Sequence, residues 1–344
     1  MKAMVLAGGL STRLYPLTRT VPKPLVPIAG EPNTAHVLRY LHSFGIRDVA
    51  MNVHYFADAI KERFGDGSAF GVRLHYLDEP ELLGSAGAVK QMESMFDDTF
   101  VVIGCDDLTD APLDQVIGFH RTRGAVATIG LIEAEDVTQY GVVILDERGK
   151  IVEFQEKPVK GTERSHLVNT GIYVFEPELL GRIPSETFFD FGKDVFPGLQ
   201  RDGAPFYGVH LRGAYWCDIG TPSEYRRATT DVLTGRLRLR GAHEARGVSP
   251  EAMLAEDVRI EGPVHIGART NVGASAHLIG PSVLGEGVMV GAGATIERSI
   301  VWDDAVIGEG AVLRDSIVGQ GYRVGERARI AAQVVANEAE PVAG

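Results

Sequence analysis

The chain has 344 residues, of which 44% are hydrophobic and 8% aromatic, a composition typical of a globular protein long enough for two domains. Its formal net charge of −12 argues against a nucleic-acid-binding protein, although a few local cations could still bind a phosphate substrate. No apolar run reaches about 18 residues, so we expect no membrane span. Met1 and Lys2 lead directly into an apolar run, which leaves no room for a signal peptide, and two cysteines provide no disulfide framework. These features favour a cytoplasmic enzyme.

An apolar run at residues 3–7 predicts a buried strand that ends at Gly8 and Gly9. Glycines allow a sharp turn with exposed N–H groups, which suit an oligophosphate. Arg13 follows, and a guanidinium can donate two hydrogen bonds to phosphate oxygens. Lys23, flanked by two prolines, is a second cation on a segment that the prolines should keep from being helical. The pattern suggests a polyphosphate site, although an ordinary strand exit with surface charges would look the same.

From residue 2 to about residue 235, short apolar runs alternate with segments of helical period. Strands are predicted at 49–53, 72–77, 100–103 and 125–129, and helices at 35–44 and 58–64. The alternation predicts a mostly parallel sheet covered by helices on both faces. Ligands of such sheets bind beyond the carboxyl ends of the strands, where we expect the loop of Gly8 and Gly9.

Glu79 precedes a segment of small residues, LGSAGA, that includes Gly84 and Gly87. Such a segment could let a base or ribose lie against the backbone, or it could be only the start of a helix. Guanine presents two adjacent donors that a carboxylate can accept together, whereas uracil and thymine present one donor between two acceptors, which suits glutamine better. Glu79 therefore favours GTP, although an exposed glutamate beside a proline would look the same.

Residues 100–110 read FVVIGCDDLTD, a hydrophobic strand that runs into Asp106 and Asp107. Carboxylates at the edge of a sheet commonly hold Mg²⁺ together with phosphate oxygens of a substrate. Ordinary capping of a strand would explain one aspartate here and explains two less well.

Two apolar segments, beginning at Tyr140 and at Ile151, predict a hairpin that turns at residues 147–149. The second segment ends in Glu156 and Lys157, which we expect to face the cleft. Further on, Thr221 is expected to cap a helix that has Pro222 at its first position.

A period of six residues runs through the C-terminal part of the chain. Apolar residues recur in this register from Ile260 to Trp302, and after a slip of one residue the rhythm resumes at Ile307. Such a period is typical of a β-helix, and about four coils are expected. β-Helices of this kind serve acyl transfer or assembly. His265 and His277 are the candidate bases for acyl transfer, but we expect both to point outwards, so assembly into a homo-oligomer is favoured.

Residues 5–27, VLAGGLSTRLYPLTRTVPKPLVP, resemble the signature of the nucleotide-sugar pyrophosphorylases (sugar-1-phosphate nucleotidyltransferases), G-G-x-G-T-R-L-x-P-L-T followed by P-K-P. The resemblance continues through LLGSAG, FQEKP, VNTGIY and WCDIGTP. Ser11 and Cys105 depart from it, because many members carry glycine there. The C-terminal repeat resembles the left-handed hexapeptide β-helix. Together with Glu79, these features point to members that transfer guanylate to mannose 1-phosphate.

The resemblance implies an α/β fold in which a Rossmann-like, mostly parallel sheet with helices on both faces is followed by a left-handed parallel β-helix. The implied domains are a catalytic domain at 1–235, a linker at 236–257, the β-helix at 258–332 and a tail at 333–344.

The implied reaction joins an NTP to a sugar 1-phosphate by in-line attack on the α-phosphorus, without a covalent enzyme intermediate. The resemblance implies that Arg13 holds the departing pyrophosphate and that Lys23 neutralises the pentavalent centre. It also implies that Asp106 and Asp218 hold Mg²⁺. The implied nucleotide-binding residues are Leu6, Ala7, Gly8, Gly9, Ser11, Thr12, Arg13, Glu79, Gly84, Gly87 and Asp106, and the sugar-phosphate-binding residues are Gly141, Glu156, Lys157 and Asn169.

GTP and mannose 1-phosphate are the favoured substrates, and a glucose-1-phosphate thymidylyl- or adenylyltransferase is the alternative enzyme. The departures at Ser11 and Cys105 keep open a regulatory subunit without turnover. A glycosyltransferase is weaker, because it would need neither the GGLSTRL loop nor the P-K-P segment.

Overall fold

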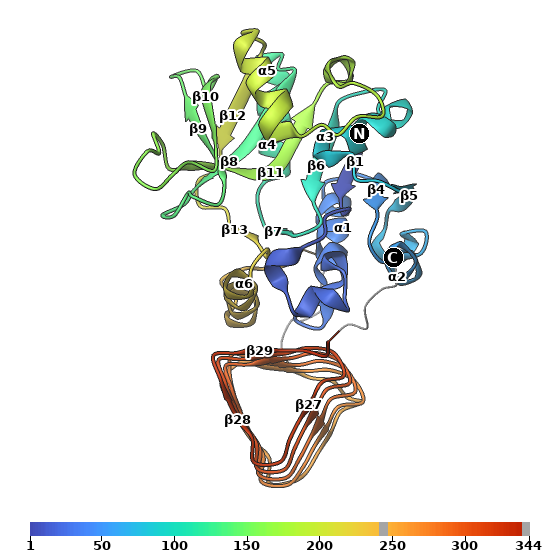
Figure 1. The fold of residues 1–344 in the computed structure, drawn as a ribbon, viewed down its shortest axis with the longest axis vertical. Helices are drawn as coiled ribbons and strands as arrows, with labels where there is room; N and C mark the ends of the chain where they lie inside the picture. Colours follow the sequence, from blue (N-terminus) through green and yellow to red (C-terminus); the bar gives the residue numbers. More distant parts are fainter. Residues whose placement is uncertain (241–246, 339–344) are drawn as a thin grey trace. The chain divides into compact units, whose positions relative to one another are not determined.

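A computed structural model describes residues 1–240 and 247–338, which divide into two compact units (Figure 1). The first unit comprises Met1–Leu10 and Val37–Asp218, and the second comprises Ser11–His36 and Ile219–Gly344. The segment with Arg13 and Lys23 therefore belongs to the same unit as the C-terminal part of the chain. Parts of the expected linker (241–246) and tail (339–344) lie outside the described residues.

The first unit is built on a nine-stranded sheet in which β1 (Lys2–Leu6) is an interior strand. Strands β4 (Asp48–Val53) and β6 (Phe100–Gly104) flank β1 in parallel, and β5 (Arg73–Asp78) follows β4 in parallel. Strand β1 is almost continuously apolar because it is buried on both faces. The strands predicted at 49–53, 72–77 and 100–103 are confirmed.

Antiparallel strands extend this Rossmann-like sheet beyond β6, where β11 pairs with β6, β8 and β9. The predicted hairpin is confirmed, since β9 and β10 are antiparallel and Gly149 between them has a φ of +80°. The remaining strands of the sheet are β8 (Ala127–Glu133), β9 (Gly141–Leu145), β10 (Ile151–Glu156), β11 (Leu167–Phe175) and β12 (Phe206–His210).

The helices are α1 (Asn33–Ser43), α2 (Ala57–Phe64), α3 (Gly84–Gln91), α4 (Leu113–Arg123), α5 (Phe196–Arg201) and α6 (Pro222–Thr234). Helix α6 begins as predicted, because the Thr221 hydroxyl accepts a hydrogen bond from the Glu224 N–H at 3.3 Å. No helix within the described residues is long and apolar enough to cross a membrane.

An aromatic cluster holds the middle of the sheet together. Each of its fully buried phenylalanines stabilises the fold by about 1.5–3 kcal/mol. The cluster fixes β6 beside β11, and the candidate site lies at the ends of these two strands. Its members are Phe100, Phe175, Phe191, Phe196 and Phe206.

In the second unit, the C-terminal strands form three parallel sheets that wind into a β-helix (Figure 1). Ile260 pairs with Leu278 and Leu278 with Ile296, which confirms the predicted repeat. The coil starts at Gly247, inside the segment expected to be a linker.

The strands of the β-helix divide among its three sheets. The first sheet holds β14 (Gly247–Val248), β17 (Val264–Ile266), β20 (Ser282–Leu284), β23 (Ile300–Val301), β26 (Ile317–Val318) and β29 (Val334–Val335). The second holds β15 (Met253–Leu254), β18 (Asn271–Val272), β21 (Met289–Val290), β24 (Val306–Ile307) and β27 (Arg323–Val324). The third holds β16 (Arg259–Glu261), β19 (His277–Ile279), β22 (Thr295–Glu297), β25 (Val312–Arg314) and β28 (Arg329–Ala331).

The assignment of Trp302 to the interior series was wrong. Leu278 pairs with Ile296, but Leu284 pairs with Val301 rather than with Trp302. The slip of one residue therefore lies between Ile296 and Val301, at a shortened corner of the coil before Trp302, and not after Trp302. Val301 belongs to the interior apolar cluster and Trp302 does not. Because neighbouring residues on a strand face opposite sides, a shift of one residue turns Trp302 outwards.

Candidate active site

The loop after β1 is held by Asn52 of the neighbouring strand. The Ala7 N–H donates to Asn52 Oδ1 at 2.9 Å, and Asn52 Nδ2 donates to Glu79 Oε2 at 2.5 Å. A Cβ atom on Gly8 would lie 2.6 Å from Asn52 Nδ2 and 2.7 Å from Glu79 Oε2, so a side chain there would displace this hydrogen-bonded pair. A Cβ atom on Gly9 would meet nothing within 4 Å. Sequence reasoning missed Asn52, although a polar residue within an otherwise apolar strand could have indicated a structural role.

Glu79 is not the exposed side chain that the alternative interpretation assumed. It is 5% exposed, and its carboxylate accepts hydrogen bonds from Asn52 Nδ2 and from the Leu83 N–H at 3.3 Å. Each carboxylate oxygen retains further acceptor capacity. A role for Glu79 in recognising a base therefore stays a prediction, beside its evident role in fixing the loop at Gly8.

Gly84 and Gly87 are required by packing within the protein. Gly84 has a φ of +75°, and a Cβ atom there would lie 2.5 Å from the carbonyl oxygen of Phe189. A Cβ atom on Gly87 would lie 2.8 Å from the carbonyl oxygen of Thr187. The start of α3 thus lies directly against a neighbouring backbone segment, which also accepts the Gly87 N–H at 3.1 Å. Contact of these glycines with a nucleotide stays a prediction.

Three carboxylates gather beyond the carboxyl end of β6. Strands β7 (Asp107–Thr109) and β13 (Trp216–Asp218) are antiparallel, and Asp218 lies opposite Asp107. A Cβ atom on Gly104 would lie 2.6 Å from Asp106 Oδ1 and 2.8 Å from Asp107 Oδ2. The fold therefore places Asp106, in the turn before β7, and Asp218, at the end of β13, beside the same residue, Asp107, at the expected edge.

Asp107 is the member of this cluster that sequence reasoning left without a role. It is 5% exposed and accepts hydrogen bonds from the Gly104 N–H and from Trp216 Nε1, each at 2.9 Å. Burial raises the pKa of Asp107 well above its usual value, and the charges of Asp106 and Asp218 raise it further. The second aspartate of the CDD run was the available signal.

The donor set fits Mg²⁺, a hard cation that prefers carboxylate oxygens. Asp106 and Asp218 are the residues that would hold it, since Asp218 pairs with Asp107 and the charges of both Asp106 and Asp218 act on Asp107. In residues 1–240 and 247–338, no group of three or more His, Cys, Asp and Glu side chains is arranged to hold a metal ion. Two carboxylates alone are a partial set, and phosphate oxygens of the substrates would have to supply further ligands.

The four predicted sugar-phosphate residues lie on or directly beside three adjacent strands. Glu156 of β10 pairs with Gly141 of β9, and β9 pairs with β11, which carries Asn169. Lys157 follows β10, with its Nζ 3.7 Å from Glu156 Oε1. Asn169 Nδ2 donates to the Tyr173 hydroxyl at 2.9 Å, which orients the amide.

The strand that carries Asn169 also contacts the carboxylates. A Cβ atom on Gly171 would lie 2.7 Å from Asp107 Oδ2, so β11 packs closely against the cluster. Burial raises the pKa of Tyr173, and the charges of Asp107 and Glu156 add to this increase. Strand β11 therefore connects the predicted sugar-phosphate residues Asn169 and Glu156 with the carboxylate of Asp107.

Ser11, Thr12 and Arg13 lie in the second unit. Ser11 has a φ of 54° and a ψ of 38°, a left-handed conformation that favours glycine and accounts for the glycine in the signature. The Ser11 carbonyl accepts the Thr18 hydroxyl at 2.8 Å, which holds the turn. Thr12 and Arg13 are exposed in the 3₁₀ turn η1 (Thr12–Leu14). Their approach to a nucleotide stays a prediction.

Lys23 begins a single 3₁₀ turn, η3 (Lys23–Leu25), so the expectation of a non-helical segment was wrong. Pro24 is compatible with this turn because a proline is tolerated in the first turn of a helix, where its missing N–H is not needed. Lys23 is 9% exposed, which is low for a lysine. Its proposed contact with a phosphate stays a prediction.

Residues 2–235 match the family model described as nucleotidyl transferase. The chain belongs to this family. Residues 247–342 match a second model, the LbH domain of EIF2B subunit epsilon, which identifies the coil as a left-handed β-helix. The nucleotidyl transferase assignment agrees with the sheet, with the loop after β1 and with the carboxylates at the end of β6.

Several relatives of this nucleotidyl transferase are named sugar-1-phosphate nucleotidyltransferases. The chain is 38% identical to a UTP–glucose-1-phosphate uridylyltransferase from Synechocystis sp., with 88% of this chain and 83% of that protein covered. It is 35% identical to a mannose-1-phosphate guanylyltransferase from Mycobacterium tuberculosis, with 88% and 79% covered. A solved structure from Bacillus anthracis, assigned as a glucose-1-phosphate thymidylyltransferase, has a TM-score of 0.61 and 25% identity, with 67% and 94% covered.

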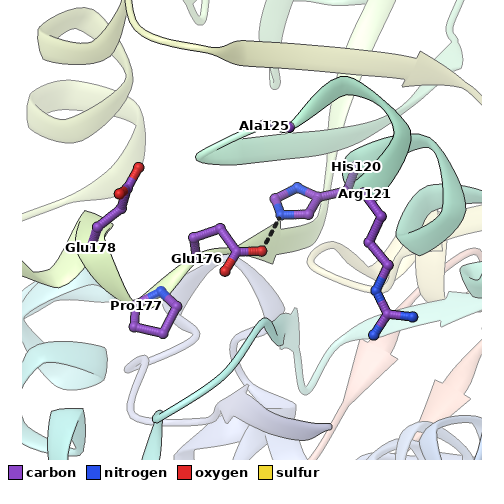
Figure 2. Close-up of a pocket in the computed structure, with 7 residues that line it drawn as sticks. His120, Arg121, Ala125, Glu176, Pro177 and Glu178 are labelled. Carbon is purple, nitrogen blue, oxygen red and sulfur yellow. Dashed lines mark hydrogen bonds and ion pairs between the residues drawn. The ribbon is translucent and has the colours of Figure 1, made fainter.

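A separate hollow of about 550 Å³ lies at the other end of β6 (Figure 2). Figure 2 shows His120 and Glu176 facing each other, with the Arg121 guanidinium directed away from them. His120 Nε2 lies 3.1 Å from Glu176 Oε1, which also accepts the Thr99 hydroxyl at 2.6 Å. Thr99 precedes β6 and Asp106 follows it, so this hollow is distinct from the nucleotidyl transferase site.

The His120 contacts predict that the protein loses stability in mild acid. Burial lowers the pKa of His120, although Glu176 opposes this change. Because the unfolded chain then binds the proton more tightly, stability falls as the pH drops below the unfolded pKa of about 6.5, by about 1.4 kcal/mol for each unit by which the folded pKa is lower. Urea unfolding between pH 7.5 and 5.5 should show a shallower pH dependence for His120→Gln than for the wild type. Equal pH dependences would contradict this explanation.

Proposed function

We propose that this sugar-1-phosphate nucleotidyltransferase makes GDP-mannose and pyrophosphate from GTP and mannose 1-phosphate. An oxygen of the sugar phosphate attacks the α-phosphorus of GTP, and the bond between that phosphorus and the bridging oxygen of the leaving pyrophosphate breaks in line. The pyrophosphate departs with the electron pair of that bond. The observation that carries the proposal is the packing of Gly171 against Asp107, which joins the predicted sugar-phosphate strand to the carboxylates.

The chain's contribution is to position phosphates and to neutralise charge. Gly8 and Gly9 would offer backbone N–H groups to the triphosphate, and Gly9 has the open space that this needs. Arg13 would hold the departing pyrophosphate, and Lys23 would neutralise the charge that develops at the α-phosphorus. Mg²⁺ held by Asp106 and Asp218 would supply further neutralisation and alignment of the phosphates.

Lys157 would bind the phosphate of the sugar 1-phosphate. It has a φ of 46° and its N–H donates to the Tyr140 carbonyl at 3.1 Å, so its backbone is fixed while its side chain remains 59% exposed. Glu156 would accept a sugar hydroxyl, and Asn169 would donate to another. Gly141 lies against the Phe154 ring, because a Cβ atom there would lie 2.5 Å from Phe154 Cζ and 3.3 Å from Glu156 Oε2, and its backbone would border the bound sugar phosphate.

The preference for GTP rests on Glu79. Its carboxylate lies beside Gly8 in the nucleotide loop, and a carboxylate accepts the two adjacent donors of guanine. The contacts with Asn52 and Leu83 fix its orientation, which favours base selection over general charge attraction.

Pyrophosphate release from GTP, UTP, dTTP and ATP, each with mannose 1-phosphate and with glucose 1-phosphate, tests the proposal. We expect kcat/KM to be highest for GTP with mannose 1-phosphate. Glu79→Gln should lower the ratio of kcat/KM for GTP to that for UTP by about 10-fold or more, on the scale of a buried polar mismatch. An unchanged ratio would remove Glu79 from base selection.

A specific observation favours a second candidate, UTP with glucose 1-phosphate. The Synechocystis relative with that activity in its name is 38% identical over 88% of this chain. In that case UTP with glucose 1-phosphate would give the highest kcat/KM, and Glu79 would serve only to hold the loop. A regulatory subunit would release pyrophosphate from none of the pairs.

The β-helix would serve assembly into a homo-oligomer rather than acyl transfer. His277 Nε2 lies 2.9 Å from Glu261 Oε1, and a Cβ atom on Gly30 would lie 2.5 Å from His265 Nε2. Each candidate base therefore has a structural contact already. Sedimentation of the full chain would test the oligomeric state.

A further inference from the structure

One outer face of the β-helix is buried although its residues point away from the interior. In the first of the three sheets, Val283, Ile300 and Ile317 pair in register and are at most 4% exposed. None of them belongs to the interior cluster, which takes Leu284, Val301 and Val318 from the same strands. The outer face of this sheet is therefore buried, and hydrogen bonds from residues next to its strands identify α6 as an element that packs near it.

Trp302, which follows Val301 of this sheet, contacts α6. Its ring meets the Tyr225 ring edge-on, with centroids 6.1 Å apart, and its Nε1 donates to the Tyr225 hydroxyl at 2.8 Å. Trp302 is 3% exposed and Tyr225 is fully buried. A second contact joins the same elements, because the Arg226 guanidinium donates to the Asp315 carbonyl.

The Tyr225 hydroxyl, which accepts from Trp302, also donates a hydrogen bond to the segment that follows Lys23. It donates to the carbonyl oxygen of Pro27 at 2.7 Å, so one phenol links the β-helix tryptophan to the backbone at residue 27. The Val26 N–H, one peptide earlier, donates to the Lys23 carbonyl at 3.1 Å. The backbone of Lys23 is thus tied to a point that Tyr225 and Trp302 hold.

Residues 27–32 form a short hairpin, and its turn contacts the first sheet of the β-helix. Pro27 pairs with Pro32, and the turn between them contains Gly30, which has a φ of +85°. A Cβ atom on Gly30 would lie 2.5 Å from Nε2 of His265, a residue of β17. The hairpin after Lys23 is therefore fixed near both its first strand and its turn.

We propose that Trp302 and Tyr225 are positioning residues for nucleotidyl transfer, through which the β-helix sets the place of Lys23. The indole N–H orients the Tyr225 hydroxyl, the hydroxyl fixes the Pro27 carbonyl, and the Pro27 segment fixes the turn that presents the lysine. This inference rests on the proposed role of Lys23. Because a displacement of about 1 Å at a reacting group can cost up to about 100-fold in rate, weak contacts this far from the chemistry have a measurable effect.

Steady-state kinetics of the full chain, with the best NTP and sugar 1-phosphate, test the proposal. Tyr225→Phe keeps the ring and removes the hydroxyl, and Trp302→Phe keeps an aromatic ring and removes the indole N–H. We expect each to lower kcat by about 10-fold and to change either KM by less than about 3-fold. The double variant should be no slower than Tyr225→Phe, because both changes break the same line of hydrogen bonds.

The matched control is Tyr76→Phe, which removes another phenol that donates to a backbone carbonyl, that of Gly65 at 2.9 Å. It should leave kcat within 2-fold. In a Lys23→Met background, Tyr225→Phe should have no further effect on the residual rate, a result that a general loss of stability would not give. Urea unfolding of every variant shows whether it is folded during the assay.

Two failures can be told apart. If Lys23→Met lowers kcat while folded Tyr225→Phe does not, the positioning role is wrong and the proposed function stands. If Lys23→Met leaves kcat unchanged, the proposed role of Lys23 is wrong, and the positioning role fails with it. Additive losses in the double variant would also overturn the proposal.

Discussion

Replacing Asp218 with asparagine is expected to lower kcat by about 100-fold or more, which corresponds to about 2.7 kcal/mol of transition-state stabilisation. The amide keeps the shape of the side chain but removes a negative charge that lies opposite Asp107. A divalent cation shared with the phosphates would then lose the negative charge of one of its two protein ligands and would bind more weakly. Pyrophosphate release measured over a range of Mg²⁺ concentrations should show a higher Mg²⁺ requirement as well as a lower maximum rate.

Loss of stability should not account for this result. The charge of Asp218 raises the pKa of the buried Asp107, so its removal relieves a repulsion. Asp97→Asn is the matched control, because Asp97 pairs with Lys2 at the surface and has a side chain 74% exposed. That control should retain activity within 2-fold. Asp218→Asn with near wild-type kcat and the same Mg²⁺ requirement would exclude Asp218 as a ligand.

Replacing Lys23 with methionine is expected to lower kcat by about 100-fold or more, on the scale of one donor that stabilises transition-state charge. Methionine retains most of the apolar stem, which suits a side chain only 9% exposed, and removes the ammonium. If the ammonium acts mainly on charge that develops during transfer, KM for the NTP should change much less than kcat. Initial rates at saturating sugar 1-phosphate measure both constants.

Lys61→Met provides the comparison for Lys23→Met. The Lys61 ammonium pairs with Asp78 at 2.5 Å at the surface of the first unit, and no role in the reaction is proposed for either side chain. Its loss should change kcat by less than 2-fold. If Lys23→Met and Lys61→Met had the same small effect, Lys23 would be a structural lysine.

Local patterns in the sequence were sufficient to predict the framework. Strand β1 is apolar at nearly every position because both of its faces are buried, and such a run is visible without any knowledge of its neighbours. Thr221 and Pro222 predict the start of α6 by local chemistry alone. The six-residue period predicts the β-helix because each coil repeats the same burial pattern.

Long-range contacts decided what the sequence could not predict. Asp107 receives its hydrogen bond from Trp216, a residue 109 positions away, so its burial becomes visible only when β7 and β13 pair. Glu79 is buried because Asn52 lies on the neighbouring strand. The position of Trp302 was predicted wrongly because one coil is a residue shorter than the six-residue period implies. A shift of one residue along a strand moves a side chain from the inner to the outer face.

The division of the chain into two units has a practical consequence for dissecting it. A fragment that ends at residue 235 would contain every residue matched by the nucleotidyl transferase model, yet it would expose Tyr225 by removing Trp302. Exchanging residues 247–338 for those of a relative would meet the same difficulty, because Tyr225 and Arg226 of α6 bond to residues of that part of the chain. A hybrid would need Tyr225, Pro27 and Trp302 from a single parent to keep the hydrogen bonds that join them.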